Sequence, residues 1–139
     1  MRTMSTKTKI SVHDVMLRID EVPVVSERTL LKEAIETMDS FKLGMVCVVE
    51  DDEFRGIITD GDIRRLLTKI QKPFSALLGD DVIRYCVKDP ITISAEAELE
   101  DAIALMGEKQ VWDLPVLAEK KLIGALHLHP AIKAVMKSK

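Results

Sequence analysis

The chain has 139 residues, of which 47% are hydrophobic, 31% are charged and 4% are aromatic, and its formal net charge is −3. With charges of both signs interspersed, no long basic block and few aromatic rings, a nucleic-acid-binding surface is not expected. The uninterrupted apolar runs, such as Met45 to Val49, are far too short to span a bilayer, and residues 1–9 lack the apolar stretch of a secretory signal. Two isolated cysteines, Cys47 and Cys86, favour a reducing, cytoplasmic location.

The first half of the chain has the pattern of five elements in the order β-α-β-β-α. Apolar residues recur at helical spacing between Leu30 and Met38, and Thr29 before them is suited to cap that helix. Two apolar runs then flank a charged turn, which is typical of paired strands. The predicted elements are an extended piece at 23–25, a helix at 30–38, strands at 45–49 and 56–59 around a turn at 50–53, and a short helix at 63–68.

The second half repeats this order after a segment that contains Pro73 and Gly79. Because proline and glycine punctuate local structure, residues 69–82 are predicted to be a linker. The elements predicted after it are an extended piece at 90–93, a helix at 99–106, strands at 114–117 and 122–128 around a turn at 118–121, and a helix at 131–136.

The two halves are copies of one unit. Ala34-Ile35 recurs as Ala102-Ile103, 68 residues later, and at this offset further apolar and glycine positions coincide across a helix, a strand and a turn. The matching pairs are Leu31 with Leu99, Met38 with Met106, Val46 with Leu114, Val48 with Val116, and Gly56 with Gly124. Agreement over three elements predicts an α+β fold with repeats at 10–68 and 83–138. Since a unit of about 60 residues buries little surface alone, the two are expected to share a core.

One string carries the chemistry of the chain: Gly-Ile-Ile-Thr-Asp-Gly-Asp-Ile-Arg-Arg, residues 56–65. It predicts a strand, a tight glycine turn and a helix, with Asp62 at the helix N-cap. One interpretation of Asp62 is structural, because a carboxylate there accepts backbone N–H bonds and suits the helix dipole. The other is functional, because the same carboxylate can accept both ribose hydroxyls of a nucleotide while Thr59 offers a hydroxyl at the strand end. Both remain open at this point.

The repeated unit, with Gly-x-x-Thr-x-x-Asp closing its first copy, resembles the CBS domain. The resemblance implies a tandem CBS pair, two β-α-β-β-α repeats packed about a pseudo-twofold axis, whose cleft binds adenosine nucleotides or other nucleosides. It implies that Thr59 and Asp62 contact phosphate and ribose. It also implies that the other copy completes the site, through its first strand and the residues just before its second strand. The residues at those positions are Ile91, Thr92, Val111, Trp112 and Asp113.

Within that family the chain is similar to the C-terminal region of arabinose-5-phosphate isomerases, through residues 43–49 and 56–65, Ile19 to Ser26, and Gly124 to His129. This implies a regulatory tail in Kdo biosynthesis that has no catalytic residues of its own and requires no cofactor. Its partners would be a sugar-isomerase domain, a second copy bound through the CBS helices, and a nucleoside effector: an adenine nucleotide or a CMP-sugar such as CMP-Kdo. Certain sugar nucleotidyltransferases carry a similar Thr-Asp-Gly-Asp-Ile-Arg-Arg string, so their CBS region is an alternative. A purely structural dimerisation module is the other.

The second copy departs from the motif. His127 stands where the first copy has Thr59, and Pro130 stands where it has Asp62. The complete nucleoside site is therefore expected only in the copy that contains Thr59 and Asp62. His127 and His129, together with His13, are a weak set for a metal ion, and no metal site is expected. For Trp112, stacking on a base and partial burial in the core are both open.

Overall fold

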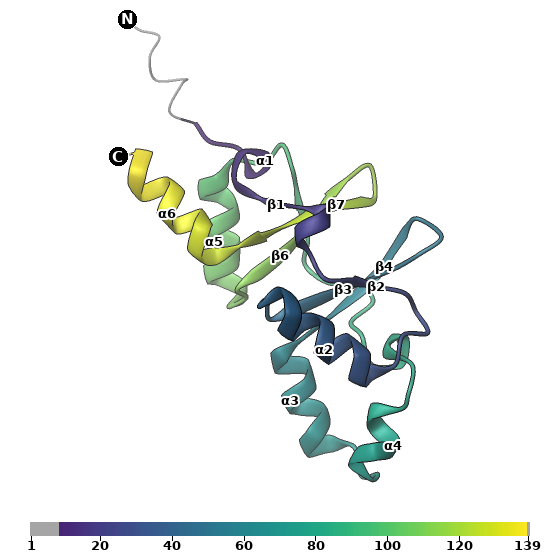
Figure 1. The fold of residues 1–139 in the computed structure, drawn as a ribbon. Coiled ribbons are helices and arrows are strands. Elements are labelled where there is room, and N and C mark those ends of the chain that lie inside the picture. The colour runs from purple at the N-terminus through teal and green to yellow at the C-terminus, as the bar shows by residue number, and fades with distance from the viewer. Residues whose placement is uncertain (1–8, 139) are drawn as a thin grey trace, which may run out of the picture. The chain divides into compact units, whose positions relative to one another are not determined.

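The computed structural model describes residues 9–138 and divides by contacts into two compact units, residues 20–90 and residues 9–19 together with 91–138 (Figure 1). Each unit contains one β-α-β-β-α repeat, which confirms the predicted α+β class. The chain passes between the units twice, at residues 19–20 and 90–91. The boundaries of the sequence repeats stay a prediction.

In the unit of residues 20–90, a three-stranded sheet has the order β2-β3-β4. β2 (Val24–Val25) runs parallel to β3 (Met45–Glu50), and β3 pairs antiparallel with β4 (Glu53–Thr59). The helices are α2 (Leu31–Phe41), α3 (Asp60–Lys69), the short α4 (Phe74–Leu78) and the 3-10 helix η3 (Val82–Arg84). The core is apolar and includes Leu31, Ala34, Met38, Val46, Val48, Ile58, Leu77 and Val82.

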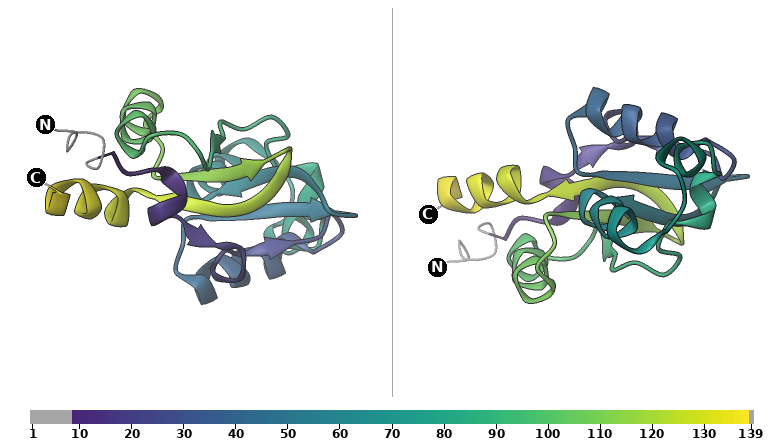
Figure 2. Two further views of the ribbon diagram at one scale, coloured as in Figure 1. Left: turned by 90° about the horizontal axis from the view of Figure 1, so that it is seen from above. Right: turned by 90° about the horizontal axis from the view of Figure 1, so that it is seen from below.

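In the other unit, a four-stranded sheet has the order β1-β7-β6-β5. β1 (Leu17–Arg18) and β6 (Asp113–Ala118) both pair antiparallel with β7 (Lys121–His127), and β5 (Ile93–Ser94) runs parallel to β6. The helices are α1 (Val12–Val15), α5 (Leu99–Lys109) and α6 (Leu128–Ser138), and the 3-10 helix η2 (Ile19–Glu21) follows β1. Figure 2 shows from two sides that α6 continues directly from β7. The core includes Val12, Leu99, Ala102, Met106, Leu114, Val116 and Leu126.

The internal repeat is visible in backbone detail. Helices α2 and α5 begin 68 residues apart, as do the strands of the β3–β4 and β6–β7 hairpins. Both hairpins shift register at the same place, after Val48 in one and after Val116 in the other. Both turns also place two residues in the left-handed region, Asp51-Asp52 and Glu119-Lys120. The shared sequence pattern therefore encodes one hairpin geometry twice.

The N-terminal segment of each predicted repeat pairs with the sheet of the other repeat. Val87 exchanges backbone bonds with Ile57, and Leu17 pairs with Ala125. Each of these close contacts requires a glycine in the paired strand. A Cβ on Gly56 would lie 2.3 Å from the carbonyl oxygen of Val87, and a Cβ on Gly124 would lie 2.2 Å from that of Leu17. Residues 10–18 thus fold with the second repeat, an exchange within the chain that the repeat pattern did not indicate.

Several local features differ from the prediction. Leu30, not Thr29, is the N-cap of α2, where the Glu33 carboxylate accepts a bond from the Leu30 N–H. Thr29 instead accepts a bond from the backbone N–H of Ser26. The segment predicted to be a linker, residues 69–82, contains the short helix α4, whose Leu77 is buried in the core. The helix predicted to begin at 63 begins at Asp60.

Candidate ligand-binding site

Thr59 and Asp62 cap each other at the start of α3. Thr59 is the N-cap, and its hydroxyl accepts a bond from the Asp62 N–H (3.2 Å). Asp62 is the third residue of the helix, and its Oδ2 accepts the Thr59 N–H and the Thr59 hydroxyl, each at 3.0 Å. The prediction of Asp62 as N-cap was therefore wrong by three positions. This reciprocal capping box satisfies two helix-end donors and fixes both side chains at the carboxyl end of β4.

Asp62 has a third partner, Arg65. The guanidinium Nη2 of Arg65 lies 2.9 Å from Asp62 Oδ1, within one turn of the same helix. The Asp62 side chain is 18% exposed, whereas that of Arg65 is 54% exposed. The Asp62 carboxylate is therefore fixed on one side by the capping box and covered on its solvent side by the long, exposed side chain of Arg65.

Gly61 has a different role from the one its sequence position indicated. It does not form a tight turn with positive φ but lies in the first turn of α3. A Cβ at this position would approach both Nη1 and Nη2 of Arg65 at 3.2 Å. The absence of a side chain therefore leaves room for the guanidinium beside Asp62.

The start of α3 is also tied to the strand beside it. The Asp60 N–H donates to the carbonyl of Gly44, which precedes β3, at 3.0 Å. The second repeat has the same bond, from the Leu128 N–H to the Trp112 carbonyl at 2.9 Å. These bonds bring the beginning of one strand, the end of the next and a helix N-terminus to one edge of each sheet.

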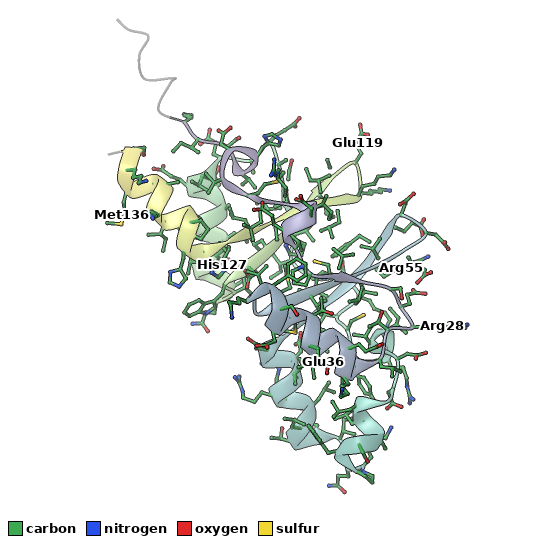
Figure 3. The ribbon with its side chains drawn as sticks, viewed as in Figure 1. Arg28, Glu36, Arg55, Glu119, His127 and Met136 are labelled. Atoms are coloured by element: carbon green, nitrogen blue, oxygen red, sulfur yellow. The ribbon has the colours of Figure 1, made fainter. Side chains whose placement is uncertain are left out.

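At the corresponding edge of the second repeat the side chains are different. His127, at the junction of β7 and α6 (Figure 3), places Nδ1 2.7 Å from Oδ1 of Asp113. The His129 ring lies 5.3 Å from the His127 ring and 5.9 Å from the Trp112 ring, centroid to centroid. Trp112 is 61% exposed, so the residue is not part of the core. Sequence reasoning missed the His127–Asp113 pair, although the offset of 68 places these residues over Thr59 and Met45, which are themselves paired.

The predicted ligand residues fall into two groups, one in each unit. Thr59 and Asp62 are in direct contact in the unit of residues 20–90. The remaining five belong to the other unit, where Trp112 and Asp113 lie at the strand end described above. Ile91 and Val111 pack partly buried against the core of that unit, and Thr92 is half-buried.

The described part of the chain, residues 9–138, contains neither a metal-binding cluster nor a membrane-spanning helix. In that range no group of three or more His, Cys, Asp or Glu side chains is arranged to hold a metal ion. No helix among the described residues combines the length and the apolar character needed to cross a membrane.

Comparison with known proteins identifies the family. The family model for the CBS domain matches twice, at residues 12–69 and 80–136. This chain belongs to the CBS domain family. Its two repeats form a CBS pair, a regulatory module, and the site edge at Thr59 and Asp62 lies in the first of them.

Curated relatives include an arabinose-5-phosphate isomerase. The CBS pair is 28% identical over 132 residues to arabinose 5-phosphate isomerase KdsD of Yersinia pestis, covering 94% of this chain and 39% of that protein. It is 32% identical over 123 residues to the uncharacterized protein RP505 of Rickettsia prowazekii, covering 88% of this chain and 36% of that protein. The chain thus spans well under half the length of these relatives.

Solved CBS-pair structures share the fold. The structure of CBSX2 in complex with AMP matches with a TM-score of 0.79 at 28% identity, covering 91% of this chain and 96% of that chain. CBSX2 from Arabidopsis thaliana matches with a TM-score of 0.78, also at 28% identity, over 91% of this chain and 94% of that one. The fold of both repeats is therefore that of known CBS pairs.

Proposed function

We propose that this CBS pair binds a nucleoside-bearing effector through Thr59 and Asp62. The observation that carries the proposal is the capping box of α3, which holds an acceptor-only carboxylate at a strand end. Ribose hydroxyls are donors and need such acceptors. That a CBS pair of 28% identity has a structure with AMP supports an adenine nucleotide as effector. The similarity to arabinose 5-phosphate isomerases supports a CMP-sugar such as CMP-Kdo.

The residues of the second unit remain proposed contacts of the same ligand, on the basis of the family resemblance. Among them Trp112 is suited to stack on a base, because its ring is exposed. Thr92 offers a hydroxyl, and Ile91 and Val111 offer the apolar surface that the core of their unit leaves uncovered. Asp113 remains a proposed ligand contact on the same resemblance, and its Oδ1 lies 2.7 Å from His127 Nδ1 within its own unit.

Regulation would follow from a shift of population. A ligand that binds one conformation of a two-unit module better than another must favour that conformation, and an attached catalytic domain would sense the change. We propose that the catalytic partner is a sugar-isomerase domain. The alternative is that this chain is the CBS region of a sugar nucleotidyltransferase. The 139 residues themselves are proposed to have no isomerase activity and to require no cofactor.

Self-association is the rival role. On α6, Ile132 and Met136 are exposed, and they line a shallow groove with His129, Lys133 and Lys137. Figure 3 shows Met136 on the outer side of this helix, where its side chain is 70% exposed. We propose a homodimer through the CBS helices. A purely structural module would use such a face but would not need Thr59 and Asp62.

The test is a thermal-shift panel of adenosine, AMP, ATP, CMP and CMP-Kdo. A ligand that binds only the folded state must raise the melting temperature. Asp62→Ala should weaken binding about tenfold to a hundredfold, the equivalent of a charge-assisted bond of about 1.5–3 kcal/mol. Asp60→Ala is the matched control, because Asp60 is an exposed carboxylate in the same first turn. If no nucleoside derivative shifts the wild type, or if both variants lose the shift equally, the proposal fails and the structural role is favoured.

A further inference from the structure

Asp62 has fewer free acceptor sites than a ribose needs. An ionised carboxylate offers about four lone-pair sites, two on each oxygen. In the structure Oδ2 accepts two bonds, both from Thr59, and Oδ1 accepts one, from Arg65. One site on Oδ1 is left. The 2′- and 3′-hydroxyls of a ribose bring two donors, so both can bind only if one present partner leaves.

Arg65 is the partner that can leave at the lowest cost. The Thr59 N–H bond is half of the capping box, so breaking it would open the first turn of α3, and the Thr59 hydroxyl is kept beside Oδ2 because it also accepts the Asp62 N–H. The Arg65 side chain is 54% exposed, and its guanidinium regains water when it swings out. Exposed ion pairs of this kind contribute little to stability.

A displaced Arg65 stays within reach of the ligand, because it is anchored one turn beyond Asp62 on α3. Its planar guanidinium then has five N–H donors free, a geometry that suits phosphate oxygens. Gly61 supports this exchange, since the open space at its Cα is where the guanidinium now lies.

We propose that Arg65 is an exchangeable partner of Asp62 that sets ligand preference at this site. A neutral nucleoside must displace the guanidinium without compensation. A nucleoside that carries a phosphate displaces it from Asp62 and then pairs with it. The site therefore discriminates in favour of phosphorylated nucleosides through one arginine. This inference rests on the proposed function, because it assumes that Asp62 accepts the ribose hydroxyls.

The experiment compares Arg65→Met with Arg64→Met by titration calorimetry. Both variants remove one positive charge from an exposed position of α3, but among the described ion pairs only Arg65 contacts Asp62. The ligands are adenosine, AMP and 2′-deoxyadenosine, with cytidine and CMP as a second pair. Arg65→Met should strengthen adenosine binding by up to about fivefold, the equivalent of losing an exposed ion pair. It should weaken AMP binding about tenfold, through the lost charge-assisted bond.

The third ligand isolates the competition for Asp62. 2′-Deoxyadenosine brings one hydroxyl donor to a carboxylate with one free site, so its affinity should be the same in the wild type and in Arg65→Met. An unchanged ratio of AMP to adenosine affinity in Arg65→Met, or an equal change in Arg64→Met, overturns the role of Arg65 alone. If the wild type binds neither these five compounds nor ATP or CMP-Kdo, the proposed function fails, and the inference fails with it.

Discussion

His127 Nδ1 lies 2.7 Å from Asp113 Oδ1, across the two strands of the β6–β7 hairpin. The Asp113 side chain is only 7% exposed, so this imidazole is a principal partner of a largely buried carboxylate. In the first hairpin the same register positions hold Thr59 and Met45. His127 in the second repeat therefore forms an internal polar pair at the position where Thr59 caps helix α3 in the first repeat.

His127→Ala should lower the free energy of unfolding by about 1–2 kcal/mol, because it leaves a largely buried carboxylate short of one hydrogen-bond partner. Urea denaturation at neutral pH measures the change. His129→Ala is the control, since its ring contacts His127 and Trp112 but the residue is exposed. An equal loss in the two variants would show that the His127–Asp113 bond contributes nothing specific.

Gly124→Ala should destabilise the protein by about 1–3 kcal/mol, the usual range for a forced overpacking. The added Cβ would lie 2.2 Å from the Leu17 carbonyl oxygen, which cannot move without separating β1 from β7. Hydrogen exchange should show lost protection at residues 10–18 before the rest of the chain. Gly107→Ala makes the matched control, because Gly107 lies inside α5 with nothing within 4 Å of its added Cβ. That variant should gain about 0.5–1 kcal/mol of helix stability. Similar effects of the two substitutions would contradict the close approach at Gly124.

The segment after α3 has its own pH-dependent anchor at Asp80. Hydrogen bonds from Lys72 and from Tyr85 hold the pKa of the Asp80 carboxyl below its usual value, and the same bond to Asp80 raises the pKa of Lys72. The Lys72 ammonium lies 2.7 Å from Asp80 Oδ2. A carboxyl with a lowered folded-state pKa stabilises the fold above its unfolded pKa, about 3.9, and this contribution is lost as pH falls through the folded value. For Lys72 the sign is reversed, and its contribution is lost only as pH rises through its raised pKa.

Asp80→Asn should therefore be less stable than the wild type at pH 7, and the difference should shrink as pH falls below about 4. Urea midpoints at pH 7, 4 and 2.5 give the comparison. Asp89→Asn serves as the control, since Asp89 is exposed beyond the network. A difference between wild type and Asp80→Asn that is independent of pH would show that the carboxylate charge is not what anchors this segment.

The repeat of the sequence was enough to predict the fold class and most elements, because helix spacing and apolar strands recur together at one offset. Every end of the four hairpin strands was predicted to within three residues. What the pattern did not reveal was the exchange of the preceding segments. The N–H of Leu99 in α5 donates to the carbonyl of Ile10, and the N–H of Leu31 in α2 donates to the carbonyl of Asp80. The two helix residues are 68 apart but their partners are 70 apart, so an alignment at the single offset of 68 does not detect the equivalence of residues 10–18 and 80–88.

At the candidate site, the sequence predicted Thr59 and Asp62 as ligand contacts but not the bonds between them. Placing the cap at Asp62 followed the usual preference of aspartate, yet a Thr three residues ahead of an acidic residue is also a capping-box pattern. The pairing of Arg65 with Asp62 was not predicted, because spacing alone cannot separate a helix-surface arginine from one that pairs at i, i+3. The Asp113–His127 pair depends on hairpin register, which is set by turn geometry rather than by composition.

The last prediction is that one nucleoside binds per chain. At the second strand end His127 is engaged by Asp113, and Pro130, three residues on, offers no side-chain acceptor and no backbone N–H. A ribose there would lack a carboxylate partner and bind about tenfold to a hundredfold more weakly. Titration calorimetry with AMP or CMP, whichever shifts the melting temperature more, should therefore give a stoichiometry near one. His127→Ala should leave that stoichiometry and affinity unchanged, while Asp62→Ala should weaken the single site. Two equal sites would contradict the single-site prediction. Loss of binding in His127→Ala with Asp62→Ala unaffected would place the ligand at the second repeat instead of the first.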